Sequence, residues 1–252
     1  PVDFAVDEML SSSNLSFCLF PLLTRGAYHA LRTHATDELK NIYLPKMVEG
    51  IWSGTMCLTE PQCGTDLGLI RTRAEPAGDG TYTIHGTKIF ISAGEHDLTE
   101  NIVHLVLARL PDAPAGVRGI SLFVCPKFLP TADGGVGERN AFACGAIERK
   151  MGIKASPTCV MNFDGAKGWL VGVPHKGLAA MFTMMNAARL AVGIQGLGVA
   201  EAAYQGAASY ARSRLKMCAP TGANYPEKAA DPIIVHPELR RMLIKMREMN
   251  EG

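Results

Sequence analysis

Hydroxyl and amide groups gather in a loop at residues 59–66, which reads Thr-Glu-Pro-Gln-Cys-Gly-Thr-Asp. Proline and glycine favour turns, so side chains and backbone amides in such a loop are displayed instead of being paired in a regular element. Groups of this kind suit a polar ligand. A capped turn, in which Thr59 and Asp66 only bond nearby backbone amides, explains the same residues equally well. The loop is therefore a candidate binding site with a plain structural alternative.

A second candidate is the segment 88–94, Lys-Ile-Phe-Ile-Ser-Ala-Gly. Its β-branched and aromatic residues predict a strand that ends in an aromatic ring, a hydroxyl and a turn of small residues. A hydroxyl at the end of a strand can face a ligand. Taken alone, this segment is only a strand end.

Other residue types point to structural roles. The seven histidines show no HxxxH spacing and no neighbouring pair of carboxylates, so we expect no metal site. Cys57 and Cys63 flank the first loop without a histidine at a recognisable spacing, which favours buried thiols over a nucleophile. The glycines of segment 193–198 lack the GxGxxG spacing and follow no strand, so close helix packing is expected there instead of a phosphate loop.

Composition limits the classes of protein to consider. The 252 residues are 47% hydrophobic and 19% charged with a net charge of +1, which excludes disorder and a broad electrostatic field for nucleic acid or an anionic membrane. Seven cysteines without a CxxC fit a reducing cytosol. No signal peptide or membrane span is evident, so we expect a cytoplasmic protein with no membrane and no nucleic-acid partner.

Three regions must position the candidate residues. Residues 7–50 have helical periodicity, with Thr36 as a possible cap and Pro45 as a kink or break. Residues 52–172 change to a period of two, without intervening helices, which favours an antiparallel sheet pair or barrel. A long helix from about 178 to 215 follows, then a Pro/Gly/Ala loop and a shorter helix from Pro237. The predicted strands cover 81–92, 101–109, 119–125 and 159–163.

Together the two candidate segments resemble motifs of the acyl-CoA dehydrogenase family. That family carries a T-E-P-x-x-G-[ST]-D loop and, about thirty residues later, a G-x-K-x-[WF]-I-[ST]-x-G strand, which are similar to residues 59–66 and 86–94 here. The similarity continues to the helix at 186–189 and so covers nearly the whole chain. The insertion near 130–144 resembles the longer branch of the family, which includes 3-methylmercaptopropionyl-CoA dehydrogenases.

The resemblance implies an α+β fold of the acyl-CoA dehydrogenase type. It implies the end of an N-terminal helical domain at 1–52, an antiparallel, barrel-like β domain at 53–173, and the start of a C-terminal helical bundle at 174–252. The chain opens without an initiator methionine and stops just after a helical pattern, so we expect a fragment.

The activity implied is FAD-dependent α,β-dehydrogenation of an acyl-CoA thioester, with electrons passed to an external electron-transfer flavoprotein. A homodimer or homotetramer is implied for the complete protein. Two alternatives remain open: a non-catalytic flavin or acyl-CoA binding relative of the family, and a purely structural domain.

The resemblance also implies roles for individual residues. Leu58 and Thr59 would bond the pyrimidine side of the flavin, and Ser92 would bond its O4 and N5. Phe90 stands where the family usually has Trp, and Arg214 would reach the FAD of a neighbouring subunit, although the following Lys216-Met217 departs from the usual Thr-Phe. The implied cofactor set is Leu58, Thr59, Thr65, Phe90, Ser92 and Arg214, and the implied substrate set is Thr65, Met185, Asn186 and Arg189.

The catalytic base is expected outside these residues. The family supplies its glutamate from a late C-terminal loop or from the position before the arginine matched by Arg189, and that second position is Ala188 here. Alanine accepts no proton. Glu60 is a possible substitute, but in the family it is a structural part of the loop. We therefore expect residues 1–252 alone to be inactive.

Overall fold

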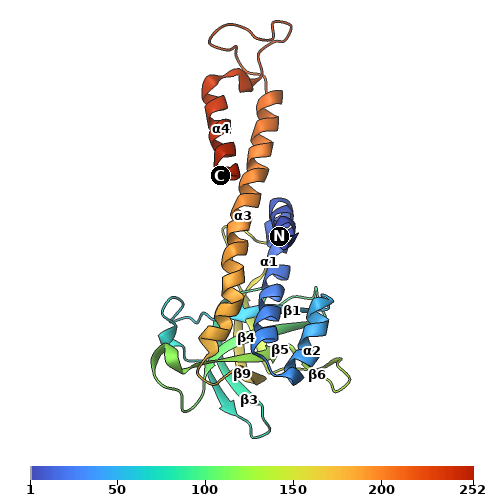
Figure 1. Ribbon diagram of the computed structural model, residues 1–252, viewed down its shortest axis with the longest axis vertical. Helices are drawn as coiled ribbons and strands as arrows, with labels where there is room; N and C mark the ends of the chain where they lie inside the picture. Colours follow the sequence, from blue (N-terminus) through green and yellow to red (C-terminus); the bar gives the residue numbers. More distant parts are fainter. Residues whose placement is uncertain (1) are drawn as a thin grey trace. The chain divides into compact units, whose positions relative to one another are not determined.

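The computed structural model describes residues 2–252, which form two compact units (Figure 1). One unit comprises residues 16–190, and the other combines the N-terminal residues up to Leu15 with residues 191–252. Helices α1 (Val2–His34) and α3 (Gly177–Ser213) each contribute to both units, and α1 leaves helical geometry at Asn14. Each unit is described by itself below.

Two helices precede the sheet in the larger unit. Helix α2 (Asp37–Val48) begins after Thr36, whose hydroxyl accepts a bond from the Leu39 amide at 3.4 Å, as the sequence predicted. The expected break at Pro45 does not occur, because α2 continues through this residue to Val48. Proline costs a helix one internal hydrogen bond, and the burial of Tyr43 and Met47 on the same helix offsets that cost.

Seven strands form the main sheet, and two form a small hairpin. The pairing order is β1-β4-β2-β3-β9-β5; β5 also pairs with β4, which closes a ring of pairings, and β8 pairs with β9 outside it. The main-sheet strands are β1 (Trp52–Cys57), β2 (Arg73–Pro76), β3 (Tyr82–Ser92), β4 (Asn101–Arg109), β5 (Ile120–Pro126), β8 (Phe142–Ile147) and β9 (Thr158–Val171). The hairpin is β6 (Phe128–Pro130) with β7 (Val136–Arg139), and short 3-10 turns are η1 (Leu67–Leu69) and η2 (Gly116–Gly119).

The sheet confirms the α+β prediction, with one difference in strand direction. No α-helix lies between β3 and β9, as expected, but β1 and β4 run parallel over six residue pairs. Parallel neighbours need a long crossover, and here the loop after β1 together with the β2–β3 hairpin supplies it. The ring is therefore mixed and not wholly antiparallel.

Strand β9 is longer than the sequence predicted. The sequence predicted a strand at 159–163, but the strand continues to Val171 and the ladder shifts register opposite His85. Gly165 is the extra residue of a β-bulge and has a φ of +84°, which glycine adopts without steric cost. The turn-forming dipeptide thus bends the strand instead of ending it.

Both faces of the ring are packed in the larger unit. On β4, Val103, Leu105 and Leu107 pack against α1, α2 and α3, whereas Val106 and Ala108 face the interior of the ring. This alternation follows the two-residue period of a strand. Because β4 is buried on both faces, its residues 102–108 are apolar except for His104.

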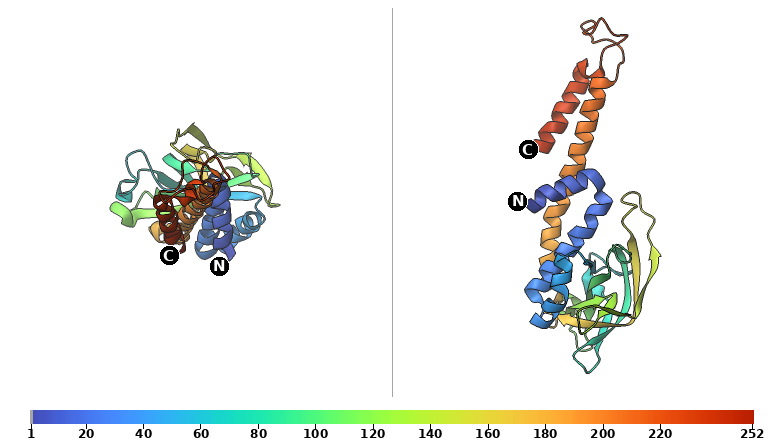
Figure 2. Two further views of the ribbon diagram at one scale, coloured as in Figure 1. Left: turned by 90° about the horizontal axis from the view of Figure 1, so that it is seen from above. Right: turned by 90° about the vertical axis from the view of Figure 1, so that its right-hand side faces the viewer.

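The smaller unit is built around the C-terminal half of α3 and helix α4 (Pro237–Glu251), which lie side by side (Figure 2). Leu243 of α4 packs on Ala208 and Ala211 of α3. In the connecting loop, the Asp231 carboxylate accepts bonds from the backbone amides of Ala219, Asn224 and Tyr225. A single buried carboxylate thereby organises a loop rich in proline and glycine.

Of the three glycines in segment 193–198, where close helix packing was expected, only Gly198 is closely packed. A Cβ on Gly198 would lie 2.7 Å from the Glu8 carbonyl, so close packing requires glycine there. Gly193 and Gly196 have nothing within 4 Å of a built Cβ. Helix α3 is also long and apolar enough to cross a membrane, with a mean hydropathy of 1.4 in its most apolar window, and core helices of soluble proteins share this length and composition.

Candidate functional site

The two candidate segments lie side by side in the larger unit. The backbone amide of Ile89 on β3 donates to the carbonyl of Thr59 in the loop after β1, at 2.9 Å. The loop itself is closed by reciprocal backbone bonds between Glu60 and Cys63, at 2.8 and 3.0 Å. The loop at 59–66 and the end of β3, which are far apart in sequence, therefore lie next to each other, and together they are called the edge below.

An irregularity in β3 shapes this edge. The β3–β9 register shifts between Lys88 and Ile91, and within this shift Phe90 has a φ of +60°. A bulky residue rarely adopts this conformation, so it is held by its surroundings. Phe90 remains 59% exposed. The bulge therefore presents an aromatic face to solvent beside the loop.

Beneath the edge lies a buried ion pair that the sequence analysis did not identify. Lys88 Nζ lies 2.8 Å from Glu60 Oε1 and 3.1 Å from the Leu58 carbonyl, and the Lys88 side chain is fully buried. Glu60 also accepts bonds from the amides of Arg71 and Thr72 and from the Gln62 side chain. The only indication of this pair in the sequence was that Glu60 and Lys88 each occupy a fixed position in one of the two motifs.

The surroundings of Glu60 decide its chemistry. Burial raises its pKa, but the charge of Lys88 and the bonds to its carboxylate oxygens outweigh burial and lower the pKa to about 2. A carboxylate that is ionised and already bonded to four donors accepts a substrate proton poorly. Glu60 therefore fits a structural role.

The polar side chains of the two segments differ in whether they form hydrogen bonds within the protein. Asp66 caps η1 by accepting a bond from the Gly68 amide at 3.0 Å, so the capped-turn interpretation holds for Asp66. Within residues 2–252, the structure gives no side-chain hydrogen bond to Thr59, Thr65 or Ser92. Thr59 and Ser92 are half-buried, and Thr65 is exposed. The capped-turn explanation thus leaves Thr59 and Ser92 without a local partner.

These features fit a flavin ring. Free hydroxyls at a loop and a strand end can bond the polar edge of such a ring, and an exposed aromatic side chain can pack against its face. Gly94 keeps the turn thin, because a Cβ there would lie 2.9 Å from the Cβ of Cys159. The residues present are therefore compatible with the ring of a flavin.

The thiols near the loop are not activated. Burial raises the pKa of Cys57 to about 12, and burial also raises the pKa of Cys63. A histidine does lie near Cys57: His104 Nδ1 is 3.7 Å from its sulfur and 2.6 Å from Thr55 Oγ1. Burial lowers the pKa of His104 to about 3, so this ring stays neutral. The arrangement supports the structural interpretation of Cys57.

Three of the four residues expected to bind the substrate lie on α3, and the fourth, Thr65, lies in the loop after β1. Met185 is half-buried against the same apolar core as Leu58, whereas Asn186 and Arg189 are exposed and bonded to each other at 2.7 Å. Ala188 lies between them and offers no proton acceptor. Arg214 belongs to the smaller unit, so the structure does not relate it to the edge.

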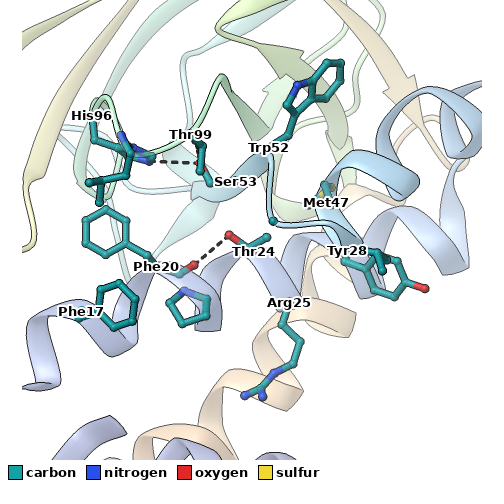
Figure 3. A pocket seen from close by; sticks show the side chains of 14 residues that line it. Phe17, Phe20, Thr24, Arg25, Tyr28, Met47, Trp52, Ser53, His96 and Thr99 are labelled. Carbon is teal, nitrogen blue, oxygen red and sulfur yellow. Dashed lines mark hydrogen bonds between the residues drawn. The ribbon is translucent and has the colours of Figure 1, made fainter. Parts of the chain in front are cut away.

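A separate cavity of about 460 Å³ lies in the larger unit, and none of the site residues proposed from the sequence lines it (Figure 3). In it, Ser53 Oγ lies 3.1 Å from both His96 Nε2 and Thr99 Oγ1. The Leu98 amide donates to His96 Nδ1, so a neutral His96 carries its proton on Nε2 and donates it to Ser53. His96 therefore does not act as a base on this serine.

No metal site accompanies these features: within residues 2–252, no group of three or more His, Cys, Asp or Glu side chains could hold a metal ion.

The mixed β ring with helices on its outer face is the fold seen in solved structures of acyl-CoA dehydrogenases. Residues 55–166 match the family description "Acyl-CoA dehydrogenase, middle domain". The 3-methylmercaptopropionyl-CoA dehydrogenase of Ruegeria pomeroyi is 54% identical over 100% of this chain and 42% of its own length. The chain belongs to the acyl-CoA dehydrogenase family.

Solved structures agree with this assignment. The butyryl-CoA dehydrogenase from Megasphaera elsdenii superposes with a TM-score of 0.81 at 26% identity, covering 98% of this chain and 59% of that one. A chain in the structure described as the electron transferring flavoprotein of Acidaminococcus fermentans gives a TM-score of 0.81 at 27% identity, with the same two coverages, 98% and 59%. The chain spans about two fifths of the length of the curated relatives it matches.

Proposed function

We propose that the protein to which these residues belong binds FAD and dehydrogenates an acyl-CoA thioester at its α,β bond. The observation that carries the proposal is the edge in which Thr59 and Ser92 hold free hydroxyls while the Ile89–Thr59 backbone bond joins their segments. FAD, when bound, supplies the hydride acceptor. The chain's own contribution is to hold and polarise the ring.

Four residues would make the ring contacts. The Leu58 and Thr59 groups would hold the pyrimidine side of the ring, and the Ser92 amide and hydroxyl would supply donors to its polar edge. Such donors stabilise negative charge on the reduced ring. Phe90, at the position where Trp is usual, would pack against the ring. Thr65, exposed on the same loop, suits the pyrophosphate and CoA end.

The thioester would lie against α3. Met185 supplies an apolar contact, and Asn186 and Arg189 supply polar groups on the exposed side of the helix. The proton at the α-carbon needs a positioned carboxylate. Glu60 is bound to four donors and position 188 is alanine, so we place the base outside residues 1–252.

Electrons would pass to an external electron-transfer flavoprotein. The likeness to a chain in the electron transferring flavoprotein structure supports an acceptor of this kind. Arg214 would act across a subunit interface, and so a homo-oligomer is proposed, in the cytoplasm. Lys216 and Met217 stand where the family usually has Thr-Phe, so this chain departs from the family pattern at that position.

The test is to purify the full-length protein, measure bound FAD by absorbance, and follow acyl-CoA-dependent dye reduction. FAD that copurifies and is reduced by one or more acyl-CoA thioesters supports the proposal. A protein that binds neither FAD nor acyl-CoA contradicts it. Binding of both without reduction would instead support a non-catalytic relative. Two observations favour that alternative: Glu60 is already bonded to four donors, and position 188 is alanine.

Residues 1–252 alone provide a second test. With excess FAD they should show no acyl-CoA-dependent dye reduction, and Ala188→Glu is the variant that could restore it. Substantial turnover by the unmodified chain would contradict the placement of the base and return attention to Glu60.

A further inference from the structure

The Lys88–Glu60 ion pair is an unusual feature for the interior of a β ring. Lys88 is fully buried and Glu60 is 3% exposed, at a separation of 2.8 Å. Removing two charges from water costs several kcal/mol per ion, and apolar replacements of such pairs are often neutral or stabilising. Stability alone is therefore a weak reason for this pair, and its geometry has to be considered.

The pair links three separate segments. Glu60 belongs to the loop after β1 and also holds the amides of Arg71 and Thr72 before β2. Lys88 belongs to β3 and also holds the carbonyl of Leu58. Without Lys88, the loop would keep its bonds to residues 71 and 72 but would lose both side-chain bonds that tie it to β3.

Lys88 also stands at the start of the bulge. It is the last residue in regular register with β9 before the shift that contains Ile89 and the strained Phe90. The Ile89 amide then bonds the Thr59 carbonyl. One side chain and the adjacent backbone amide therefore fix the same loop from two directions. Local strain of this kind persists only where the surroundings hold it.

We infer that Lys88 is a positioning residue that, through Glu60 and the Leu58 carbonyl, holds the ring-contact edge, defined as Leu58, Thr59, Phe90 and Ser92. This rests on the proposed function, because the ring in question is that of FAD. Lys88 touches no flavin atom itself. It acts by keeping the Leu58 carbonyl and the Thr59 hydroxyl in register with the end of β3.

The test uses the full-length protein and four variants. Lys88→Met keeps the length of the side chain and removes its charge, leaving Glu60 unpaired. Glu60→Gln/Lys88→Met removes both charges, so no buried ion remains uncompensated. Lys88→Arg keeps the charge. Lys167→Met is the matched control, because it breaks an exposed lysine–aspartate pair at 3.3 Å on β9.

The readouts are thermal unfolding, FAD affinity, and the absorbance spectrum and reduction potential of the bound flavin. We expect Lys88→Met to weaken FAD binding at least tenfold and to shift the flavin spectrum and potential. The double variant should regain most of the thermal stability but keep the altered flavin properties, since the Leu58 carbonyl is still released. Lys88→Arg should restore part of the affinity, and Lys167→Met should match the wild type.

Two results would overturn the inference. The first is a double variant that is folded and binds FAD with wild-type affinity, spectrum and potential. The second is loss of folding in both Lys88→Met and the double variant, which would assign the pair to stability alone. A wild-type protein that binds no FAD would reject the proposed function itself, a result that the wild-type sample reports separately.

Discussion

The backbone amide of Ile89 and the carbonyl of Thr59 are 2.9 Å apart, and this bond joins a loop after β1 to the bulged end of β3. Neither strand pairs directly with the other in the ladder of the sheet. The bond therefore fixes a contact that the strand pairing does not provide. The hydroxyls of Thr59 and Ser92 and the ring of Phe90 depend on it for their relative placement.

Replacing Thr59 and Ser92 together with alanine should weaken FAD binding and lower the flavin potential in the full-length protein. Each hydrogen bond to the charged reduced ring is worth about 1.5–3 kcal/mol before compensation. Affinity is measured by fluorescence titration, and potential by dye equilibration. Thr33→Ala, which removes an exposed hydroxyl bonded to the His29 carbonyl, is the control. Wild-type affinity and potential in the double variant would show that the ring lies elsewhere.

Two glycines of α3 should respond to alanine with opposite signs. A Cβ on Gly177 would lie 2.3 Å from the Ser121 carbonyl carbon, so Gly177→Ala should destabilise the protein by about 1–3 kcal/mol through overpacking. Gly193 has open space around it, and Gly193→Ala should stabilise by up to about 1 kcal/mol through helix propensity. Urea unfolding monitored by circular dichroism measures both. Equal effects would contradict the packing at the start of α3.

His104 should make stability depend on pH. Its folded pKa of about 3 lies below the unfolded value of 6.5, so the folded state binds fewer protons. The stabilisation is complete above pH 6.5 and falls by about 1.4 kcal/mol per pH unit as the pH drops toward 3. Unfolding free energies between pH 7 and 5 should therefore slope less in His104→Gln than in the wild type. The same slope in both would mean that His104 protonates freely in the folded protein.

Thiol reactivity should follow burial. Cys218 is exposed and Cys144 is partly exposed, whereas Cys57, Cys63, Cys125 and Cys159 are buried, as is Cys18. Burial raises the pKa of Cys57 to about 12, so its reactive thiolate is scarce at neutral pH. Ellman's reagent at pH 7 should modify one thiol rapidly, and Cys218→Ser should remove that phase. Rapid modification of Cys57 in the folded protein would contradict its structural role.

Local patterns were sufficient for several elements. The strand predicted at 101–109 is β4 with the same bounds, and Thr36 caps α2 as predicted. A run of apolar β-branched residues and a threonine before an acidic first turn are signals that act within a few residues of chain. The two motifs that place the chain in its family are likewise contiguous in sequence.

Nonlocal features required the tertiary structure. The parallel pairing of β1 with β4 depends on which strand finds which neighbour, and no periodicity within either strand encodes that choice. The dipeptide Asp164-Gly165 is typical of a turn, but it forms a bulge within β9 instead. The strand continues there because β9 pairs with both β3 and β8.

The candidate site divides in the same way. The sequence by itself determined which hydroxyl, aromatic and small residues the two segments carry, because residue types and short spacings are properties of the chain. Only the tertiary structure decided that Asp66 is a cap while Thr59 has no side-chain bond, and that Glu60 forms an ion pair with Lys88. Those outcomes depend on which donor lies within about 3 Å of which acceptor, and on how far burial removes each group from water. Both are fixed only when the loop packs against β3 in the folded protein.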